Sequence, residues 1–316
     1  MILRKLAVSL IFFVVLAAAA TLWRLSVREA RALADTPPLG QFITVEGLRL
    51  HYVQTGAGPD LVMIHGASGS LRDFTFDLVP ELAQSYRVTV FDRPGLGYSD
   101  PLPNGDVSLS SQARILRLAA NDLGATKPIL LGQSYGGAVA LAWSLDAPPP
   151  ALVLISSASL PWPGTLDPWY GLNENRIFRA IAMPLAAAWV PKSFVHRVIN
   201  GIYAPEAMPT GYADYMGLDQ SLRVAPLEVN VMQVNALRDQ IVAMAPRYPA
   251  LTLPIEMVHG DTDTIVPLRI HSAPLASRLP SANLTVIPGA GHMPHHTQPQ
   301  IVIDAINRAA TRAGLR

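Results

Sequence analysis

The chain contains no cysteine, which excludes a disulfide framework, an iron–sulfur cluster and a zinc site built on thiolates. Charged residues are also scarce, at 15% of the chain against about 25% in an average soluble domain. Hydrophobic residues reach 50%, and this composition excludes intrinsic disorder. At 316 residues, the chain is long enough for one large domain or two small ones with a substantial core.

The few charges are divided unevenly along the chain. Residues 1–34 hold five Lys or Arg residues and one acid, which leaves 19 basic and 22 acidic residues in the remainder. The remainder therefore carries a net charge of −3 and offers no basic surface for the phosphate backbone of a nucleic acid. We expect no nucleic-acid partner.

The N-terminus contains a long apolar run. Leu6–Trp23 has 18 residues without a charge, of which only Ser9 and Thr21 are not hydrophobic. As a helix this run would span roughly 27 Å, close to the roughly 30 Å of a bilayer's hydrocarbon core. Residues 1–34 are therefore predicted to be a single-pass membrane anchor. Basic residues flank the run on both sides, so their distribution does not determine the orientation of the helix. The side of the membrane on which the catalytic domain lies therefore remains undetermined.

A cleavable signal peptide, followed by export, is the alternative for the same segment. Ala32–Ala34 before Asp35 matches a small-residue cleavage site. That site lies well beyond the apolar run, across three arginines, so the sequence favours a retained anchor.

The rest of the chain carries the pattern of a buried sheet. Gln41–Val45 and Leu48–Val53 read as an antiparallel hairpin. Six short apolar runs without alternation follow, as expected for strands covered on both faces. These runs are Leu61–Ile64, Val88–Phe91, Pro128–Leu131, Leu152–Ile155, Pro254–Val258 and Leu284–Ile287.

Segments with helical periodicity lie between these runs. Val107–Leu123 is the clearest, because Ser108 or Ser110 can cap its start and Gly124 can end it. Strands and helices in alternation predict an α/β fold with a mostly parallel, doubly wound, eight-stranded sheet over residues 41–159 and 251–316.

Residues 160–250 interrupt this alternation. They contain no convincing strand, but hold Trp162, Trp169, Trp189, five of the nine methionines and scattered prolines that predict short helices. We expect a helical cap over the carboxyl ends of the strands, where open α/β sheets bind ligands. The alternative is that these aromatic residues form only the core of a small helical subdomain.

A candidate nucleophile lies at a sharp turn. Gly132–Gly136 reads G-Q-S-Y-G, follows the strand Ile129–Leu131 and precedes the predicted helix Gly137–Leu145. This is the G-x-S-x-G turn in its required setting, where glycines allow the crowded, strained backbone that exposes Ser134.

With four further segments, the chain from about Gln41 onward resembles the α/β-hydrolase-fold serine hydrolases. These are His65–Gly69 (H-G-x-x-G), Phe91–Ser99 (containing D-x-P-G-x-G-x-S), Gly260–Pro267 (G-x-x-D-x-x-V-P) and Gly289–His292 (G-x-G-H). The resemblance implies a triad in the family's order, with Ser134 as nucleophile, Asp263 as acid and His292 as base. A serine hydroxyl needs such a base at neutral pH. The backbone N–H groups of Ala67 and Tyr135 are the candidate oxyanion hole.

Several neighbouring residues have other interpretations. Asp261 could replace Asp263 as the acid, although it occupies a variable position of the motif. His295 and His296 suggest a metal cluster, but they follow His292 in a proline-flanked turn with no third ligand at metal-site spacing. We therefore expect no metal and no cofactor.

Four other polar residues are interpreted as structural. His65 is expected to lock the oxyanion loop, and Asp92 and Arg93 to brace the turn after their strand. His259, at a strand end, is expected to be a packed core histidine.

The predicted activity is hydrolysis of a carboxylic ester, or a related acyl bond, of an apolar small molecule or lipid through an acyl-enzyme. Ser134 excludes the relatives with aspartate at the turn, the haloalkane dehalogenases and epoxide hydrolases. The C–C hydrolases of aromatic ring-cleavage products share the triad and remain an alternative, although they commonly carry tryptophan at the position of Met293. A catalytically inactive binding protein on the same fold is the other alternative. Fold and triad leave the substrate open.

Overall fold

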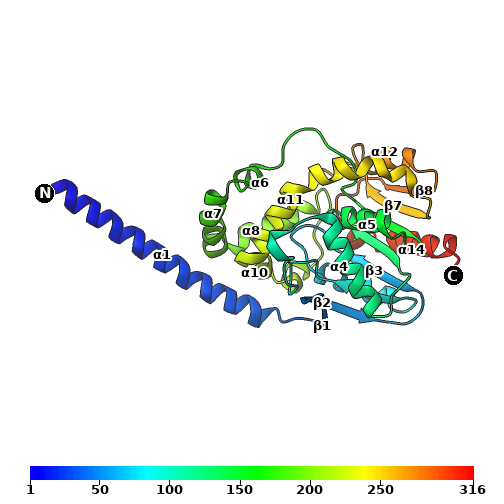
Figure 1. Cartoon of the computed structure of the whole chain (residues 1–316), viewed down its shortest axis with the longest axis horizontal. Helices are drawn as coiled ribbons and strands as arrows, with labels where there is room; N and C mark the ends of the chain where they lie inside the picture. Colours follow the sequence, from blue (N-terminus) through cyan, green and yellow to red (C-terminus); the bar gives the residue numbers. More distant parts are fainter.

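The computed structural model describes residues 1–316 and is built around one eight-stranded sheet (Figure 1). The strands lie side by side in the order β1-β2-β4-β3-β5-β6-β7-β8. Their bounds are β1 Gln41–Val45, β2 Leu48–Thr55, β3 Asp60–Ile64, β4 Arg87–Phe91, β5 Ile129–Gln133, β6 Leu152–Ile155, β7 Ile255–Gly260 and β8 Ala282–Ile287. The predicted fold class is confirmed, and each predicted strand is present within a few residues.

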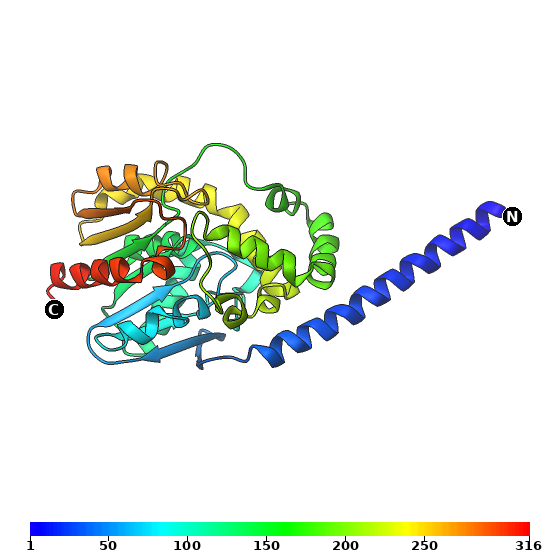
Figure 2. The same cartoon turned by 180° about the vertical axis from the view of Figure 1, so that it is seen from behind.

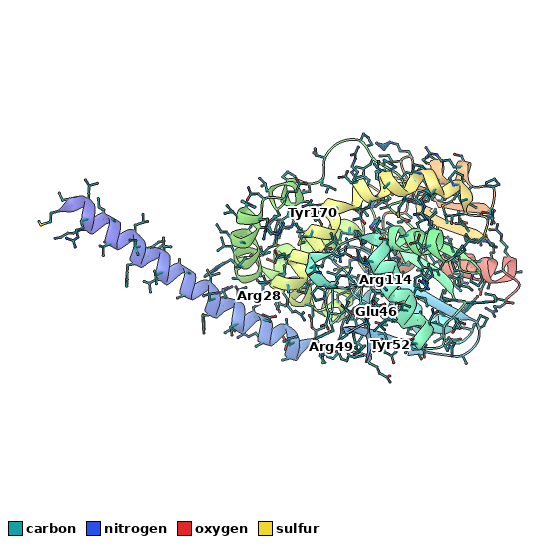
Figure 3. All side chains as sticks on the ribbon, viewed as in Figure 1. Arg28, Glu46, Arg49, Tyr52, Arg114 and Tyr170 are labelled. Carbon is teal, nitrogen blue, oxygen red and sulfur yellow. The ribbon has the colours of Figure 1, made fainter.

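The sheet is antiparallel only at one edge. β1 pairs with β2 and β2 with β4 in antiparallel register, whereas all pairs from β4 to β8 are parallel. The β1–β2 turn places Glu46 and Gly47 at φ 49° and 82°, the left-handed pair that suits a two-residue hairpin. Arg114 of the helix α4 (Leu109–Asp122) donates two hydrogen bonds of 2.7 Å to the Glu46 carboxylate (Figure 3).

Helices cover both faces of the sheet (Figures 1 and 2). α4, α5 (Tyr135–Asp146) and α12 (Ser272–Arg278) contribute to the core on one face. The short helices α2 (Arg72–Thr75) and α3 (Leu78–Leu82) and the C-terminal α14 (Pro299–Arg312) cover the other. As predicted, Ser108 caps α4, its hydroxyl accepting a hydrogen bond from the Ser111 N–H. Because both faces are covered, every residue of the central strands β5 and β6 is buried, and the strands do not alternate between apolar and polar residues.

Residues between β6 and β7 form helices that lie mostly between α1 and the sheet in Figure 1. They are α6 Pro168–Leu172, α7 Arg176–Trp189, α8 Lys192–Ile202, α9 Tyr212–Met216, α10 Leu218–Ser221, α11 Val224–Met244 and η2 Ala245–Ala250. The expectation of short helices only is wrong for α11, which runs for 21 residues. Its one proline, Pro226, lies in the first turn. Backbone N–H groups in the first turn have no intrahelical acceptor, so the proline removes no helical hydrogen bond.

The N-terminal helix α1 (Ile2–Asp35) projects away from the body over its first half (Figures 1 and 2). By length and composition it is a candidate membrane span. The loop helices η1 (Pro103–Gly105) and α13 (Pro294–Thr297) complete the fold, and α13 directly follows the G-x-G-H segment.

Candidate active site

Ser134 occupies the turn between β5 and α5 in a strained backbone conformation. Its φ and ψ are 52° and −119°, in a region that L-residues rarely adopt. The flanking glycines are required by close packing. A Cβ on Gly136 would overlap the carbonyl oxygen of Ile64, and one on Gly132 would overlap the carbonyl oxygen of Gly136. The local sequence therefore produces the strained strand-to-helix turn that the G-x-S-x-G pattern predicts.

Three residues from separate loops converge at this turn. The Ser134 hydroxyl lies 3.0 Å from His292 Nε2, and His292 Nδ1 lies 2.7 Å from Asp263 Oδ2. Asp263 follows β7 and His292 follows β8, so neighbouring parallel strands deliver both groups to one end of the sheet. All three residues are at least nine-tenths buried. The hydrogen-bond chain runs from hydroxyl to imidazole to carboxylate, the arrangement that activates a serine.

The environment of Asp263 keeps its carboxylate ionised. Burial alone would raise its pKa, but the charge of His292 and hydrogen bonds from His259 and His292 lower it far below its ordinary value. The backbone N–H groups of Ile265 and Val266 also donate to Asp263 Oδ1, at 2.8 and 2.9 Å. A carboxylate held by this many donors fixes the His292 ring with its Nδ1–H toward Asp263 and Nε2 toward Ser134.

His259 belongs to the same group of side chains. It is fully buried, as expected of a core histidine, but its Nε2 lies 3.1 Å from Asp263 Oδ2 and 2.7 Å from the Val266 carbonyl oxygen. The sequence analysis missed this contact. Asp261, by contrast, is exposed and accepts a hydrogen bond from the Gly289 N–H.

The candidate oxyanion donors lie on either side of Ser134. Tyr135 is the first residue of α5, where backbone N–H groups have no intrahelical partner. The Ala67 N–H, in the loop after β3, donates to no acceptor within the chain. The next residue, Ser68, is held at φ 56° and donates its N–H to Asn230 Oδ1 of α11 at 2.7 Å.

Arg93 and His65 brace this loop from inside. The Arg93 guanidinium is fully buried, donates to the carbonyl oxygens of His65 and Gly66 at 3.0 Å each, and packs on the Tyr135 ring. His65 Nε2 accepts the Arg93 N–H at 2.9 Å. Burial and the nearby Arg93 charge lower the pKa of His65 to about 4, so the ring is neutral at neutral pH. Both residues therefore shape the loop that carries the Ala67 N–H.

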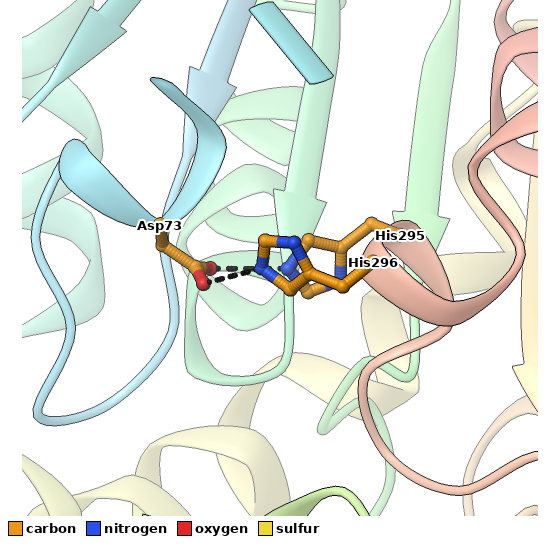
Figure 4. A group of neighbouring side chains, drawn as sticks. All are labelled: Asp73, His295 and His296. Carbon is orange, nitrogen blue, oxygen red and sulfur yellow. Dashed lines mark hydrogen bonds and ion pairs between the residues drawn. The ribbon is translucent and has the colours of Figure 1, made fainter. Parts of the chain in front are cut away.

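A second polar cluster lies next to the loop that carries His292, where Asp73 of α2 meets His295 and His296 of α13 (Figure 4). Asp73 Oδ2 lies 3.2 Å from His295 Nε2, and Asp73 Oδ1 lies 3.0 Å from His296 Nε2. The sequence predicted no third ligand beside the two histidines, but folding supplies Asp73 from more than 200 residues away. The ligand atoms lie within 4.8 Å of one another, a spacing that a metal ion could bridge.

Hydrogen bonds account for most of this cluster. His296 Nδ1 donates to Asp77 at 2.8 Å, and the Tyr212 hydroxyl donates to Asp73 at 2.6 Å. Burial alone would lower the pKa of His296, but the hydrogen bonds to Asp73 and Asp77 raise it to about 9. The cluster therefore holds an imidazolium between two carboxylates at neutral pH and ties the helix after His292 to α2.

This fold and these motifs define the class of protein. Residues 59–299 match the family described as the alpha/beta hydrolase fold, and the chain belongs to that family. It is a hydrolase of the esterase type.

Three relatives illustrate the likeness. A pimeloyl-[acyl-carrier protein] methyl ester esterase of Aeromonas hydrophila is 32% identical over 265 residues, covering 79% of this chain and 95% of its own length. The structure of an alpha/beta hydrolase fold protein from Burkholderia ambifaria is 25% identical, with a TM-score of 0.70 over 85% of this chain and 97% of its own. The structure of a membrane phospholipase A is 18% identical, with a TM-score of 0.67 over 97% of this chain and 99% of its own, and shares the fold.

Proposed function

We propose that the protein is a membrane-anchored serine hydrolase that cleaves the carboxylic ester of an apolar small molecule or lipid through an acyl-enzyme. The observation that carries the proposal is the chain of contacts from Ser134 Oγ to His292 Nε2 at 3.0 Å and from His292 Nδ1 to Asp263 at 2.7 Å. The Aeromonas relative, named as a methyl ester esterase, supports an ester as the scissile bond.

In the first half-reaction, Ser134 Oγ attacks the ester carbonyl carbon while His292 Nε2 takes the hydroxyl proton. The ionised Asp263 stabilises the imidazolium that forms. The N–H groups of Ala67 and Tyr135 donate to the negatively charged carbonyl oxygen of the tetrahedral intermediate. As that intermediate collapses, His292 returns the proton to the departing alcohol, leaving the acyl group on Ser134.

In the second half-reaction, a water molecule replaces the alcohol. His292 takes one proton from the water, the resulting hydroxide attacks the acyl carbon, and the proton passes to Ser134 Oγ as the acid leaves. None of these steps calls for a cofactor.

Residues 160–250 are assigned to a cap, and residues 41–159 and 251–316 to the catalytic core. Cap side chains hydrogen-bond to the loops on both sides of the site, through Asn230 to the Ser68 N–H and through Glu206 to the Gly291 N–H. The low charge and the Trp and Met content of this segment support an apolar acyl group as substrate.

Residues 1–34 are assigned to a retained anchor. Support comes from the contacts that Arg24 and Arg28 make with α7, which cleavage after Ala34 would remove. Fractionation of cells that express a C-terminally tagged chain tests the assignment. We expect the full-length chain in membranes, resistant to carbonate extraction, and a soluble product that begins near Asp35 would contradict it.

Active-site labelling tests the activity. A fluorophosphonate should label the purified protein but not the Ser134→Ala variant, whereas an inactive binding protein would remain unlabelled. A panel of p-nitrophenyl esters from acetyl to decanoyl, beside one vinylogous diketone, then separates ester hydrolysis from C–C hydrolysis. We expect kcat/KM to rise roughly two- to fourfold per methylene up to medium chains. Turnover of the diketone alone would contradict the ester assignment.

A further inference from the structure

The second half of α1 is docked on the cap instead of hanging free of it. Arg28 lies between α1 and the cap (Figure 3) and donates to the carbonyl oxygens of Ala187 and Val190, at 3.0 and 2.7 Å. These carbonyls belong to the last turn and C-cap of α7, where they lack intrahelical partners. Arg28 also forms a 2.9 Å ion pair with the buried Asp219 of α10. A cation at a helix C-terminus is favourable, so this contact fixes α7 against α1.

A neighbouring contact determines where along α1 the cap packs. The Trp189 indole N–H donates to the Thr21 hydroxyl at 3.1 Å, and the Arg24 guanidinium lies over the Trp189 ring. Thr21 and Arg24 mark the end of the charge-free run. If α1 spans a bilayer, the boundary between hydrocarbon and headgroups passes at this level. Trp189 is half exposed there, and Trp23 of α1 is exposed at the same level, where membrane proteins place tryptophan.

An apolar stripe continues from Trp189 along the outside of the cap. Four side chains of α7 at a stride of four residues are exposed: Ile177, Ile181, Leu185 and Trp189. Phe178 of the same helix and Phe194 and Val198 of α8 are exposed as well. Both helices are amphipathic, so their inner faces pack on the body while these outer side chains remain exposed.

Basic residues outnumber acidic ones around this stripe, and the exposed Glu174 lies just before α7. Residues 175–205 contain four Lys or Arg residues and no Asp or Glu, although the chain beyond residue 34 is net acidic. Arg176 and Arg197 are exposed beside the apolar side chains, and Lys192 is exposed there too while it pairs with Asp219 at 2.7 Å. Helices with an apolar face and basic flanks bind the interface of anionic bilayers.

We propose that the outer face of α7 and α8 rests in the interface of the same bilayer that α1 crosses, so that the cap over the active site is itself a lipid-binding surface. This inference rests on the proposed anchoring of α1. Covalent continuity with the candidate span and the excess of basic charge select a lipid surface as the occupant. The consequence is that esters dissolved in the membrane reach the cap without crossing bulk water.

Because the chain has no cysteine, single-cysteine variants of the full-length protein can each carry one spin label. The cap positions are Phe178→Cys and Phe194→Cys. Leu10→Cys reports insertion of α1. Val286→Cys is the matched control, an exposed apolar residue of β8 at the far end of the sheet from α7 (Figure 1). Collision with oxygen, which partitions into lipid, and with a water-soluble nickel chelate is measured in vesicles of phosphatidylcholine and phosphatidylglycerol at three to one.

We expect the labels at residues 10, 178 and 194 to collide more with oxygen than with the chelate, and the label at residue 286 to do the reverse. Labels at residues 178 and 194 that behave like the label at residue 286, while the label at residue 10 is in lipid, would overturn the inference and leave the anchor intact. Protection from both reagents with spin–spin broadening would show a second copy on this face and overturn it. A water-exposed label at residue 10 would refute the anchor itself.

Activity provides a second readout. The double variant Phe178→Glu/Phe194→Glu should hydrolyse a long-chain ester held in these vesicles at least about tenfold more slowly, because two aromatic side chains that the proposal places in lipid would be replaced by charged ones. Its rate on soluble p-nitrophenyl butyrate should stay within twofold of the parent's. Val286→Glu should change neither rate. An equal loss on both substrates would mean that the cap is damaged, and an unchanged vesicle rate would mean that the face does not touch lipid.

Discussion

The imidazole of His259 lies 3.1 Å from the Asp263 carboxylate, which also contacts His292, so the acid sits between two histidines. His259 touches neither Ser134 nor a candidate oxyanion donor in the hydrogen-bond network, and acts only through Asp263. Its Nδ1 is held at 2.7 Å from the Ser272 hydroxyl, which fixes the ring. We therefore expect His259 to act as a positioning residue for the candidate triad.

His259→Phe should keep the ring volume and remove the contact with Asp263. We expect kcat to fall about tenfold, because one donor to the carboxylate is lost. The acidic limb of the kcat/KM profile should move to higher pH, because a carboxylate with one donor fewer holds the imidazolium more tightly. His271→Phe, at a buried histidine that does not contact the triad, should leave the limb in place. A role in packing alone would lower stability without moving the limb.

Ser134→Ala, His292→Ala and Asp263→Asn should each lower kcat by at least about 10³. Since the three groups act as a unit, Ser134→Ala/His292→Ala should cost little more than either single change. Steady-state kinetics on a soluble ester measure both effects. Asp261→Asn is the control at the exposed neighbouring acid, and near-normal turnover in Asp263→Asn but not in Asp261→Asn would reverse the assignment.

Ala67→Pro removes one backbone N–H and no side-chain chemistry. We expect kcat to drop roughly 10² to 10³, since a lost oxyanion donor costs about 3 kcal/mol in the transition state. Ala67→Ser keeps the N–H and should retain activity. Circular dichroism checks that both variants are folded, and a folded proline variant with unchanged kcat would exclude this donor.

His296 should make stability fall at alkaline pH. Its pKa is raised to about 9 in the folded chain from about 6.5 in the unfolded chain. The contribution, about 3 kcal/mol, is therefore complete below about pH 6.5 and is lost as pH rises through about 9. The Tm difference between the parent and His296→Gln should be large at pH 6 and small at pH 10. His196→Gln, at an exposed histidine, should give a difference that is small at both pH values.

Arg28→Ala should release α1 from the cap. The change leaves the buried Asp219 with Lys192 alone and removes two hydrogen bonds to α7, so we expect a loss of about 3 kcal/mol in stability. Limited proteolysis in detergent should cut the variant between α1 and β1 faster than the parent. Arg31→Ala, at an exposed arginine of the same helix, should change stability by less than about 0.5 kcal/mol. Equal cleavage of all three proteins would contradict the docking contact.

The sequence predicts the sheet and the candidate triad because their signals are local. Continuous apolar runs mark buried strands, and the turns that present Ser134, Asp263 and His292 each need glycine within a few positions. The contact of Asp73 with His296 carries no such signal. The two residues lie more than 200 positions apart, and neither belongs to a periodic pattern of apolar residues. The sequence likewise does not predict that Arg28 contacts α7, because in the sequence this arginine is only one of the basic residues that follow the apolar run.

Residues of the segment between β6 and β7 hydrogen-bond to both loops of the candidate site. Asn230 accepts the N–H of Ser68, beside the oxyanion loop, and Glu206 accepts the N–H of Gly291, next to His292. The loop that carries the Ala67 N–H and the loop that carries His292 are therefore both tied to the same segment between β6 and β7. A substitution in that segment can disturb the candidate oxyanion donor and the candidate base together, although it touches neither of them.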